Sequence, residues 1–201
     1  MVGEKIDQCM KPHGDEGIET IKRMNENHKP ISEFAFECVD FTRDAKILDI
    51  GCGGGINIEK FLKLTSNDVD GLDYSEISVA ESTKRNESSG RCKIFKANVC
   101  DMPIEDDSYD LVTAFETIYF WPEISETFKE VSRIVKPNGQ FMIAQGTDGN
   151  HPDDEKWLAT VEGMSVYTGP ELEKYLLDGG FSSVKSYVKE NDHILVVIAQ
   201  K

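Results

Sequence analysis

Short apolar runs alternate with amphipathic stretches along most of this chain. Apolar runs bounded by glycine or polar turns indicate buried strands, whereas apolar positions three or four residues apart indicate helices. The pattern predicts strands over 46–50, 69–72, 93–97, 109–115, 140–145, 183–189 and 193–200. It predicts helices over 56–64, from an N-cap at Ser75 to residue 86, and along the apolar positions 124, 128, 131 and 135.

Proline and glycine mark where several of these elements begin and end. Pro122 suits the first turn of the helix that carries positions 124 to 135. Lys136-Pro137-Asn138-Gly139 predicts a turn before the next strand. Gly169-Pro170 opens a further helix, and Gly179-Gly180 ends it.

This order of elements predicts an α/β fold, with a doubly wound, mostly parallel seven-stranded sheet and helices on both faces. The last two strands flank Glu190-Asn191-Asp192 and predict a closing hairpin. The hairpin makes the C-terminal strand antiparallel, and we expect the antiparallel strand at the sheet edge. Ligands of such sheets bind outside the carboxyl ends of the strands, where the strand order reverses.

The first 45 residues differ in composition from the rest. They predict two short helices, over 18–24 and 31–41, separated by His28-Lys29-Pro30. We assign 1–45 as an extension of the domain that 46–201 form. Met1-Val2-Gly3-Glu4-Lys5 leads into no apolar segment, so no signal peptide is expected. The longest apolar run, 194–199, is too short to span a bilayer.

Composition narrows the classes of partner. The chain has 201 residues, which suits one domain with one sizeable core. Its 22 basic and 37 acidic residues give a net charge of −15, which disfavours nucleic acid and anionic membranes as partners. The five cysteines are scattered and form no Cys-x-x-Cys pair, so we expect no disulfide framework, no metal site and a reducing cytoplasm.

A glycine-rich loop follows the first predicted strand and opens the first predicted helix of the main domain. Its glycines stand at 51, 53 and 55, whereas a dinucleotide fingerprint needs one at position 56, which is Ile56. No Gly-Lys-Ser/Thr sequence follows, which excludes a P-loop. Asp49 precedes the loop, and its charge would repel a pyrophosphate but attract an ammonium or sulfonium.

Asp73 ends the second predicted strand. An acid at this position can accept hydrogen bonds from both ribose hydroxyls of an adenosine. Together, the glycine spacing, Asp49 and Asp73 favour an adenosine ligand with a cationic amino-acid tail.

These motifs resemble the class I S-adenosylmethionine-dependent methyltransferases, in particular the small type-11 methyltransferase domain group. The resemblance extends from about residue 46 to 143. It is carried by the segments Asp49-Ile50-Gly51-Cys52-Gly53-Gly54-Gly55, Asp73, 97–103, 107–112, 128–131 and 136–139. It implies a Rossmann-like fold, S-adenosyl-L-methionine as methyl donor, S-adenosylhomocysteine as product, and a helical N-terminal lid over the substrate.

The resemblance also assigns residues to the methyl donor. These are Asp49, Gly51, Cys52, Gly53, Gly55, Asp73, Tyr74, Asn98, Val99 and Phe115. Asn98 stands where the family commonly has an aspartate on the adenine amine. Cys52 lies near a helix N-terminus, which can lower the pKa of a thiol, but we expect a small filler in a tight loop.

The loop 115–122 follows the fourth strand and should overhang the reacting methyl group. Phe115 and Glu116 would then line the methionine end, and Tyr119 and Trp121 would wall a substrate pocket. The alternative is that Phe120 and Trp121 merely cover the core.

The sequence leaves the catalytic residue open. Candidates for a general base are Glu116, His13, His28 and Tyr119. His193 is expected to be structural, and 151–154 form a polar loop that could reach the pocket rim.

The expected reaction is in-line methyl transfer to a small molecule by a monomer or homodimer. Residues 116–122 contain neither the Asn/Asp-Pro-Pro-Tyr/Phe motif of amine and glutamine methyltransferases nor a Pro-Cys pair for cytosine. Clustered cysteines, as arsenic chemistry would need, are not apparent. A non-catalytic module that binds S-adenosylmethionine and a nucleotide-dependent oxidoreductase are the alternatives.

Overall fold

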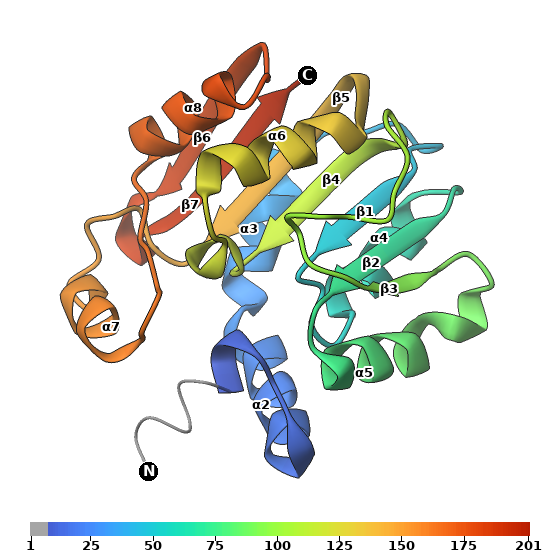
Figure 1. Cartoon of the computed structure of the whole chain (residues 1–201), viewed down its shortest axis with the longest axis horizontal. Helices are drawn as coiled ribbons and strands as arrows, with labels where there is room; N and C mark the ends of the chain where they lie inside the picture. Colours follow the sequence, from blue (N-terminus) through green and yellow to red (C-terminus); the bar gives the residue numbers. More distant parts are fainter. Residues whose placement is uncertain (1–7) are drawn as a thin grey trace.

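The computed structural model describes residues 8–201, so the expectation about a signal peptide over the first residues lies outside the described part of the chain. A seven-stranded sheet forms its centre, with strand order β3-β2-β1-β4-β5-β7-β6 (Figure 1). The strands are β1 (Ile47–Ile50), β2 (Val69–Asp73), β3 (Ile94–Lys96), β4 (Tyr109–Phe115), β5 (Val135–Gln145), β6 (Ser183–Lys189) and β7 (Ile194–Gln200).

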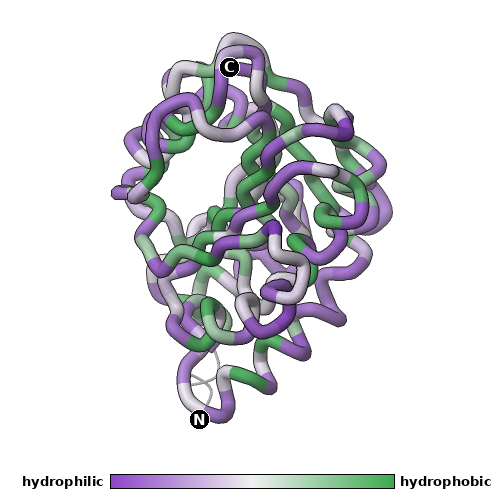
Figure 2. The backbone as a smooth tube through the Cα atoms, turned by 90° about the vertical axis from the view of Figure 1, so that its right-hand side faces the viewer, coloured by the Kyte–Doolittle hydropathy of each residue, from purple (hydrophilic) through white to green (hydrophobic). Residues whose placement is uncertain are grey.

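Helices cover both faces of the sheet, which confirms the doubly wound architecture. They are α2 (Gly14–Asn27), α3 (Lys29–Cys38), α4 (Ile56–Leu64), α5 (Glu76–Asn86), α6 (Ile124–Ile134), α7 (Asp154–Thr160) and α8 (Gly169–Asp178). Helices α6 and α8 pack on one face, and α3 and α4 on the other. Figure 2 shows apolar segments through the middle of the molecule and polar residues towards its outside.

Alternate residues of each strand point into two separate hydrophobic cores. In β1, Leu48 and Ile50 join the core under α6 and α8, whereas Ile47 joins the core under α3 and α4. All three are almost fully buried. A short central strand buried on both faces explains why its sequence is a continuous apolar run interrupted only by Asp49.

The first strand is the switch point of the sheet. β1 pairs in parallel with β2 on one side and with β4 on the other. The chain therefore runs outwards from β1 to β3 and then returns to β4. The loops that follow β1 and β4 diverge at the carboxyl ends of these two neighbouring strands. Figure 1 shows α2 on the side to which the arrows of β1 and β4 point.

Several boundaries confirm the sequence-based expectation. Helix α4 and strand β4 have the predicted limits, and β6 and β7 form the predicted hairpin. Ser75 is the N-cap of α5, where its hydroxyl accepts a hydrogen bond from the backbone N–H of Ser78 at 3.3 Å. In these segments the signals are local, so neighbouring residues suffice to determine the structure.

The hairpin is placed differently from the expectation. β7 lies between β5 and β6 and is antiparallel to both, so the antiparallel strand is inside the sheet and β6 forms the edge. The burial of β7 explains this order, because its residues Leu195 to Val197 are almost completely buried, whereas most of β6 is exposed.

The predictions for Pro122 and for the turn at 136–139 were wrong. Pro122 precedes the N-cap residue Glu123, so it lies just before α6. Strand β5 continues through 136–139, where Asn138 has a φ of 63°. In the ladder between β4 and β5, Tyr109 pairs with Val135, and the next pair is Leu111 with Gln140. β5 therefore has extra residues at this point, which form a bulge before regular pairing resumes.

Helix α7 was not predicted, since its seven residues have no buried member and thus no apolar stripe. It projects from the body of the molecule beyond the end of β5 (Figure 1). No helix within residues 8–201 is long and apolar enough to cross a bilayer.

Candidate functional site

The glycine loop between β1 and α4 uses backbone conformations that other residues rarely adopt. Gly51, Gly53 and Gly55 all have positive φ, of 69°, 51° and 72°. A Cβ at Gly53 would meet nothing within 4 Å, so this part of the loop faces open space. The loop therefore offers bare backbone to a ligand.

Asp73, at the end of β2, is joined to this loop. Its Oδ2 accepts a hydrogen bond from the N–H of Gly53, and its Oδ1 accepts one from the N–H of Ser75, both at 2.9 Å. The side chain is buried, and burial raises the pKa of Asp73 above its ordinary value. These bonds fix the carboxylate beside the loop.

Asp49, in β1, is the most deeply buried acid of the site, with 2% of its surface exposed. Its Oδ1 accepts a hydrogen bond from Thr113 Oγ1 at 2.7 Å. Burial, with a smaller contribution from the charge of Asp73, raises the pKa of Asp49 to about 7. A buried carboxylate of this kind is stabilised by an opposite charge, so it favours a cationic ligand group.

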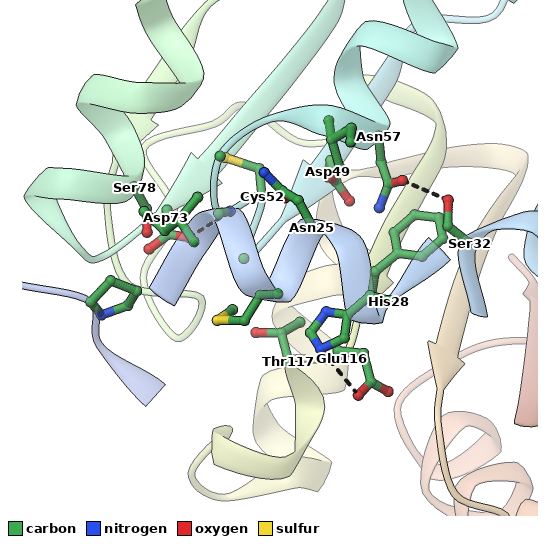
Figure 3. A pocket seen from close by; sticks show the side chains of 18 of the residues that line it. Asn25, His28, Ser32, Asp49, Cys52, Asn57, Asp73, Ser78, Glu116 and Thr117 are labelled. Atoms are coloured by element: carbon green, nitrogen blue, oxygen red, sulfur yellow. Dashed lines mark hydrogen bonds and ion pairs between the residues drawn. The ribbon is translucent and has the colours of Figure 1, made fainter. Parts of the chain in front are cut away.

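A first cavity lies over the glycine loop and measures about 90 Å³ (Figure 3). Helix α2 covers it, and a Cβ at Gly54 would meet the side chains of Ile21 and Asn25. On the opposite side, Ser32 Oγ of α3 donates a hydrogen bond to Asn57 Oδ1 of α4 at 2.7 Å. Ligand pockets usually measure about 300–1,000 Å³, so α2 leaves much less room than a nucleoside needs.

A second, larger cavity of about 510 Å³ adjoins the first. Five residues line both cavities, namely Cys9, Met24, His28, Glu116 and Phe120. The residues that line only the second are Arg23, Asn27, Tyr119, Gly146, Thr147, His151, Asp154, Trp157, Val161 and Met164. A molecule in one cavity can therefore meet a molecule in the other beside His28 and Glu116.

Glu116 occupies this junction in a strained conformation, with a φ of 56°. A non-glycine residue in this region costs about 1–3 kcal/mol and persists only where its surroundings hold it. Its Oε1 accepts hydrogen bonds from the hydroxyl of Tyr119, at 2.8 Å, and from the N–H of Gly146. Its Oε2 lies 3.9 Å from His28 Nε2 (Figure 3).

Tyr119 supports Glu116 as a hydrogen-bond donor. Burial, followed by the negative charge of Glu116, raises the pKa of the Tyr119 hydroxyl well above its ordinary value. The hydroxyl therefore keeps its proton, which argues against Tyr119 as a general base. Tyr119 lines the second cavity, and its contact with a substrate stays a prediction.

The predicted substrate contact by Trp121 was wrong, because this side chain lies in the hydrophobic core. Its ring centre lies 6.2 Å from those of Phe128 and Phe141, and its Nε1 donates to Thr117 Oγ1 at 3.3 Å. The 3₁₀ turn Ile118–Phe120 redirects the chain, so Phe120 faces the cavities in its place.

The structure does not bring His13 to the site. His13 is the N-cap residue of α2, and its ring lies 3.2 Å from Gln8 Nε2. It lines neither cavity. His28, which ends α2 at the start of α3, is the histidine that reaches the junction.

Asn98 and Val99 also lie apart from the first cavity. The side chain of Val99 packs in the core, and Asn98 Oδ1 accepts a hydrogen bond from the N–H of Cys100 at 3.0 Å. The contact of Asn98 with an adenine stays a prediction.

The remaining sequence-predicted positions lie near the site. Phe115 and Tyr74 line the first cavity. Cys52 does so as well, and burial raises the pKa of its thiol well above the ordinary value, which disfavours a reactive thiolate. His151 lines the second cavity, and His193 pairs with Asp148 at 3.2 Å. The described residues contain no cluster of three or more possible metal ligands.

Sequence reasoning missed the part of α2 that covers the loop. Ile21, Met24, Asn25 and His28 are three or four residues apart and therefore share one face of the helix. This spacing was visible in the sequence, but the partner of that face was not.

Comparison with known proteins agrees with this geometry. Residues 48–143 match the family described as "Methyltransferase domain". Sterol 24-C-methyltransferase erg6 of Aspergillus fumigatus is 28% identical over 125 residues, which are 58% of this chain and 33% of that protein. Methyltransferase GfsG of Streptomyces halstedii is 29% identical over 158 residues, which are 77% of this chain and 56% of that protein. The chain thus spans about a third to a half of these relatives.

Two solved structures share the fold. A SAM-dependent methyltransferase from Aquifex aeolicus superposes with a TM-score of 0.73 at 18% identity, covering 90% of this chain and 97% of that one. Phosphoethanolamine N-methyltransferase 2 of Haemonchus contortus, solved with S-adenosyl-L-methionine, gives 0.74 at 15% identity, covering 86% and 52%.

The pKa of Asp49 predicts a pH-dependent effect on stability. The folded protein binds this proton more tightly than the unfolded chain, so the buried charge destabilises the fold increasingly from about pH 4 to about 7. Asp49→Asn should therefore gain stability relative to the unaltered protein across this range, with no further gain above it. Urea unfolding at several pH values measures the difference. Asp40→Asn, at an exposed position, serves as the matched control, and a pH-independent difference for Asp49→Asn would contradict the assignment.

Proposed function

Because residues 48–143 belong to the methyltransferase domain family and the chain has the fold of class I S-adenosylmethionine-dependent enzymes, we propose that this protein methylates a small molecule. The observation that carries the proposal is the junction of the two cavities at His28, Glu116 and Phe120. One cavity has the polar groups that suit a nucleoside with a cationic tail, and the other has room for an acceptor. When bound, S-adenosylmethionine supplies a methyl group on a sulfonium that is already reactive.

The residues of the first cavity fit this methyl donor. Gly53 leaves space that a side chain would fill, and Asp73 stands beside it with two carboxylate oxygens for ribose hydroxyls. Asp49 supplies a buried negative charge towards the cationic part of the ligand. Ile56 begins α4 at the position where a dinucleotide site needs glycine, which disfavours an oxidoreductase.

Glu116 is the proposed general base. Its Oε1 is held by two donors, and its Oε2 has no hydrogen-bond donor closer than His28 among the described residues. An acceptor in the second cavity can place a hydroxyl or ammonium proton beside Oε2. Transfer of that proton to Glu116 leaves a lone pair for the methyl group. An aligned base beside an aromatic cavity favours an enzyme over a non-catalytic binding module.

Helix α2 is the proposed lid. It narrows the first cavity to about 90 Å³, so it must move outwards to admit the donor. Polar anchors at its N-terminal end include the Ser75 hydroxyl, which donates to Pro12 O at 2.6 Å. At its other end, the chain turns into α3 at the single residue His28. Residues 14–27 can therefore move with respect to α3, which packs on the sheet.

The acceptor is a small molecule, according to this proposal, because the second cavity of about 510 Å³ suits one and the net charge of −15 disfavours a polyanion. The relatives include proteins named as sterol methyltransferases, which supports the same class. Cys38, Cys52, Cys92 and Cys100 carry free thiols, and a reducing cytoplasm stays our expectation. A monomer or homodimer stays our expectation.

Asp73→Ala should weaken the binding of S-adenosylhomocysteine. Each lost hydrogen bond to a charged group costs about 1.5–3 kcal/mol, or roughly one to two orders of magnitude in the dissociation constant. Calorimetric titration measures the change, with Asp68→Ala, at an exposed position, as control. Equal affinity of the two variants would contradict the ribose assignment. Binding of NAD in place of S-adenosylhomocysteine would favour the oxidoreductase.

Glu116→Gln should slow methyl transfer by about 10²–10⁴-fold while S-adenosylhomocysteine affinity stays nearly unchanged, because glutamine keeps the shape but cannot take the proton. The assay follows label from S-adenosylmethionine into a metabolite extract. Glu123→Gln is a matched control, since Glu123 also has a positive φ, of 43°, but lines neither cavity. Unchanged turnover in Glu116→Gln would remove its catalytic role. Label in tRNA, DNA or protein alone would contradict a small-molecule acceptor.

Backbone amides of α2 should exchange with deuterium more slowly when S-adenosylhomocysteine binds, because the lid closes on the ligand. Hydrogen exchange with mass spectrometry measures this, and α8, on the far side of the sheet, should be unaffected. Equal exchange of α2 with and without ligand would show that it is a fixed part of the fold.

A further inference from the structure

Two of the described residues that line the second cavity are carboxylates. Glu116 lies where this cavity meets the first, and Asp154 contributes from the start of α7. Asp154 Oδ2 accepts hydrogen bonds from Thr147 Oγ1, at 2.8 Å, and from the N–H of His151, at 3.0 Å. Neither partner carries a full positive charge through these groups, so the negative charge of Asp154 stays available to a ligand.

Tyr119 lies within electrostatic range of both acids. The charges of Glu116 and, to a smaller extent, Asp154 add to burial in raising the pKa of its hydroxyl. The two carboxylates thus act on one region of the cavity. They make it attractive to a positive group and costly for a negative one.

The basic residues of the cavity do not offset these charges fully. Arg23 is the only permanent cation among the described residues that line it, and its side chain is exposed on α2. His151 Nδ1 accepts a hydrogen bond from the N–H of Asp153 at 3.0 Å. The remaining basic residue, His28, is paired with Glu116.

The remaining walls suit the body of an organic cation. Aromatic side chains are contributed by Tyr119, Phe120 and Trp157, and the rings of Tyr119 and Phe120 meet edge to face at 6.2 Å. Aromatic faces attract ammonium groups as well as burying apolar surface. Both acids and all three rings therefore favour the same class of ligand.

We propose that the methyl acceptor is an amine with an apolar or aromatic body, which enters the second cavity as an ammonium ion between Glu116 and Asp154. This inference rests on the proposed methyltransferase function and names its substrate class. The ammonium N–H bond breaks and its proton passes to Glu116 Oε2. The nitrogen lone pair then forms the N–CH₃ bond as the S–CH₃ bond breaks, and the sulfonium leaves as the neutral thioether of S-adenosylhomocysteine. The methylated nitrogen carries the positive charge away, and Glu116 returns its proton to water.

The test compares three probes that share one ring and differ in charge, namely phenethylamine, 2-phenylethanol and phenylacetate. Binding to the full chain with saturating S-adenosylhomocysteine is measured by ligand-observed NMR titration. We expect phenethylamine to bind at least about tenfold more tightly than the alcohol, and phenylacetate to bind most weakly. Equal binding of the three, or a preference for phenylacetate, would overturn the proposal.

Two variants separate the charge of Asp154 from its structural role. In Asp154→Asn the amide oxygen can still accept from Thr147 and His151, so the loop keeps its hydrogen bonds while the charge is lost. The preference for phenethylamine over 2-phenylethanol should then fall several-fold. Asp153→Asn is the matched control, since Asp153 precedes it and lines neither cavity. A preference that Asp154→Asn leaves intact would contradict the role of this acid.

A product assay separates this inference from the proposed function. Labelled products from the metabolite extract are first separated from the unreacted S-adenosylmethionine, which is itself a cation, and are then passed over a cation exchanger, which retains methylated amines. Retained label supports the amine acceptor. Label that flows through as neutral or acidic product overturns the amine while methyl transfer stands. Absence of both labelled product and S-adenosylhomocysteine binding would contradict the methyltransferase itself.

Discussion

The site depends on keeping three carboxylates close together at the carboxyl ends of neighbouring strands. Asp49 lies in β1, Asp73 ends β2 and Glu116 follows β4, and these three strands are adjacent. Each acid is largely removed from water, so each needs hydrogen-bond donors or a positive ligand to stay charged. The protein supplies donors through Thr113, the loop N–H of Gly53 and the hydroxyl of Tyr119. The negative charge that these donors leave uncompensated favours cationic ligands in both cavities.

Features set by neighbouring residues could be predicted from the sequence. The glycine loop and Asp73 belong to one strand–helix–strand unit, β1–α4–β2, so both follow from a short segment. The parallel sheet follows from the alternation of strands and helices. Ser75 as a helix cap and the hairpin of β6 and β7 are also local signals.

Features that need distant parts of the chain could not be predicted. Phe120 and Trp121 are adjacent aromatic residues, and only the 3₁₀ turn that ends at Phe120 decides which one faces a cavity. The second cavity combines α2, the loop after β4 and the segment around α7, so no single stretch of sequence reveals it. β7 lies inside the sheet because its side chains are buried. The hairpin motif alone does not show which of its two strands, β6 or β7, will be the more buried.

Helix α2 supplies walls to both cavities, through Ile21 and Asn25 on one side and Arg23 and Asn27 on the other, with Met24 shared. Any outward movement that exposes the glycine loop therefore also dismantles part of the second cavity. An acceptor already in the second cavity would resist the movement of α2 that admits or releases the nucleoside. We expect this shared wall to impose an ordered kinetic scheme, in which the nucleoside is the first ligand to bind and the last to leave.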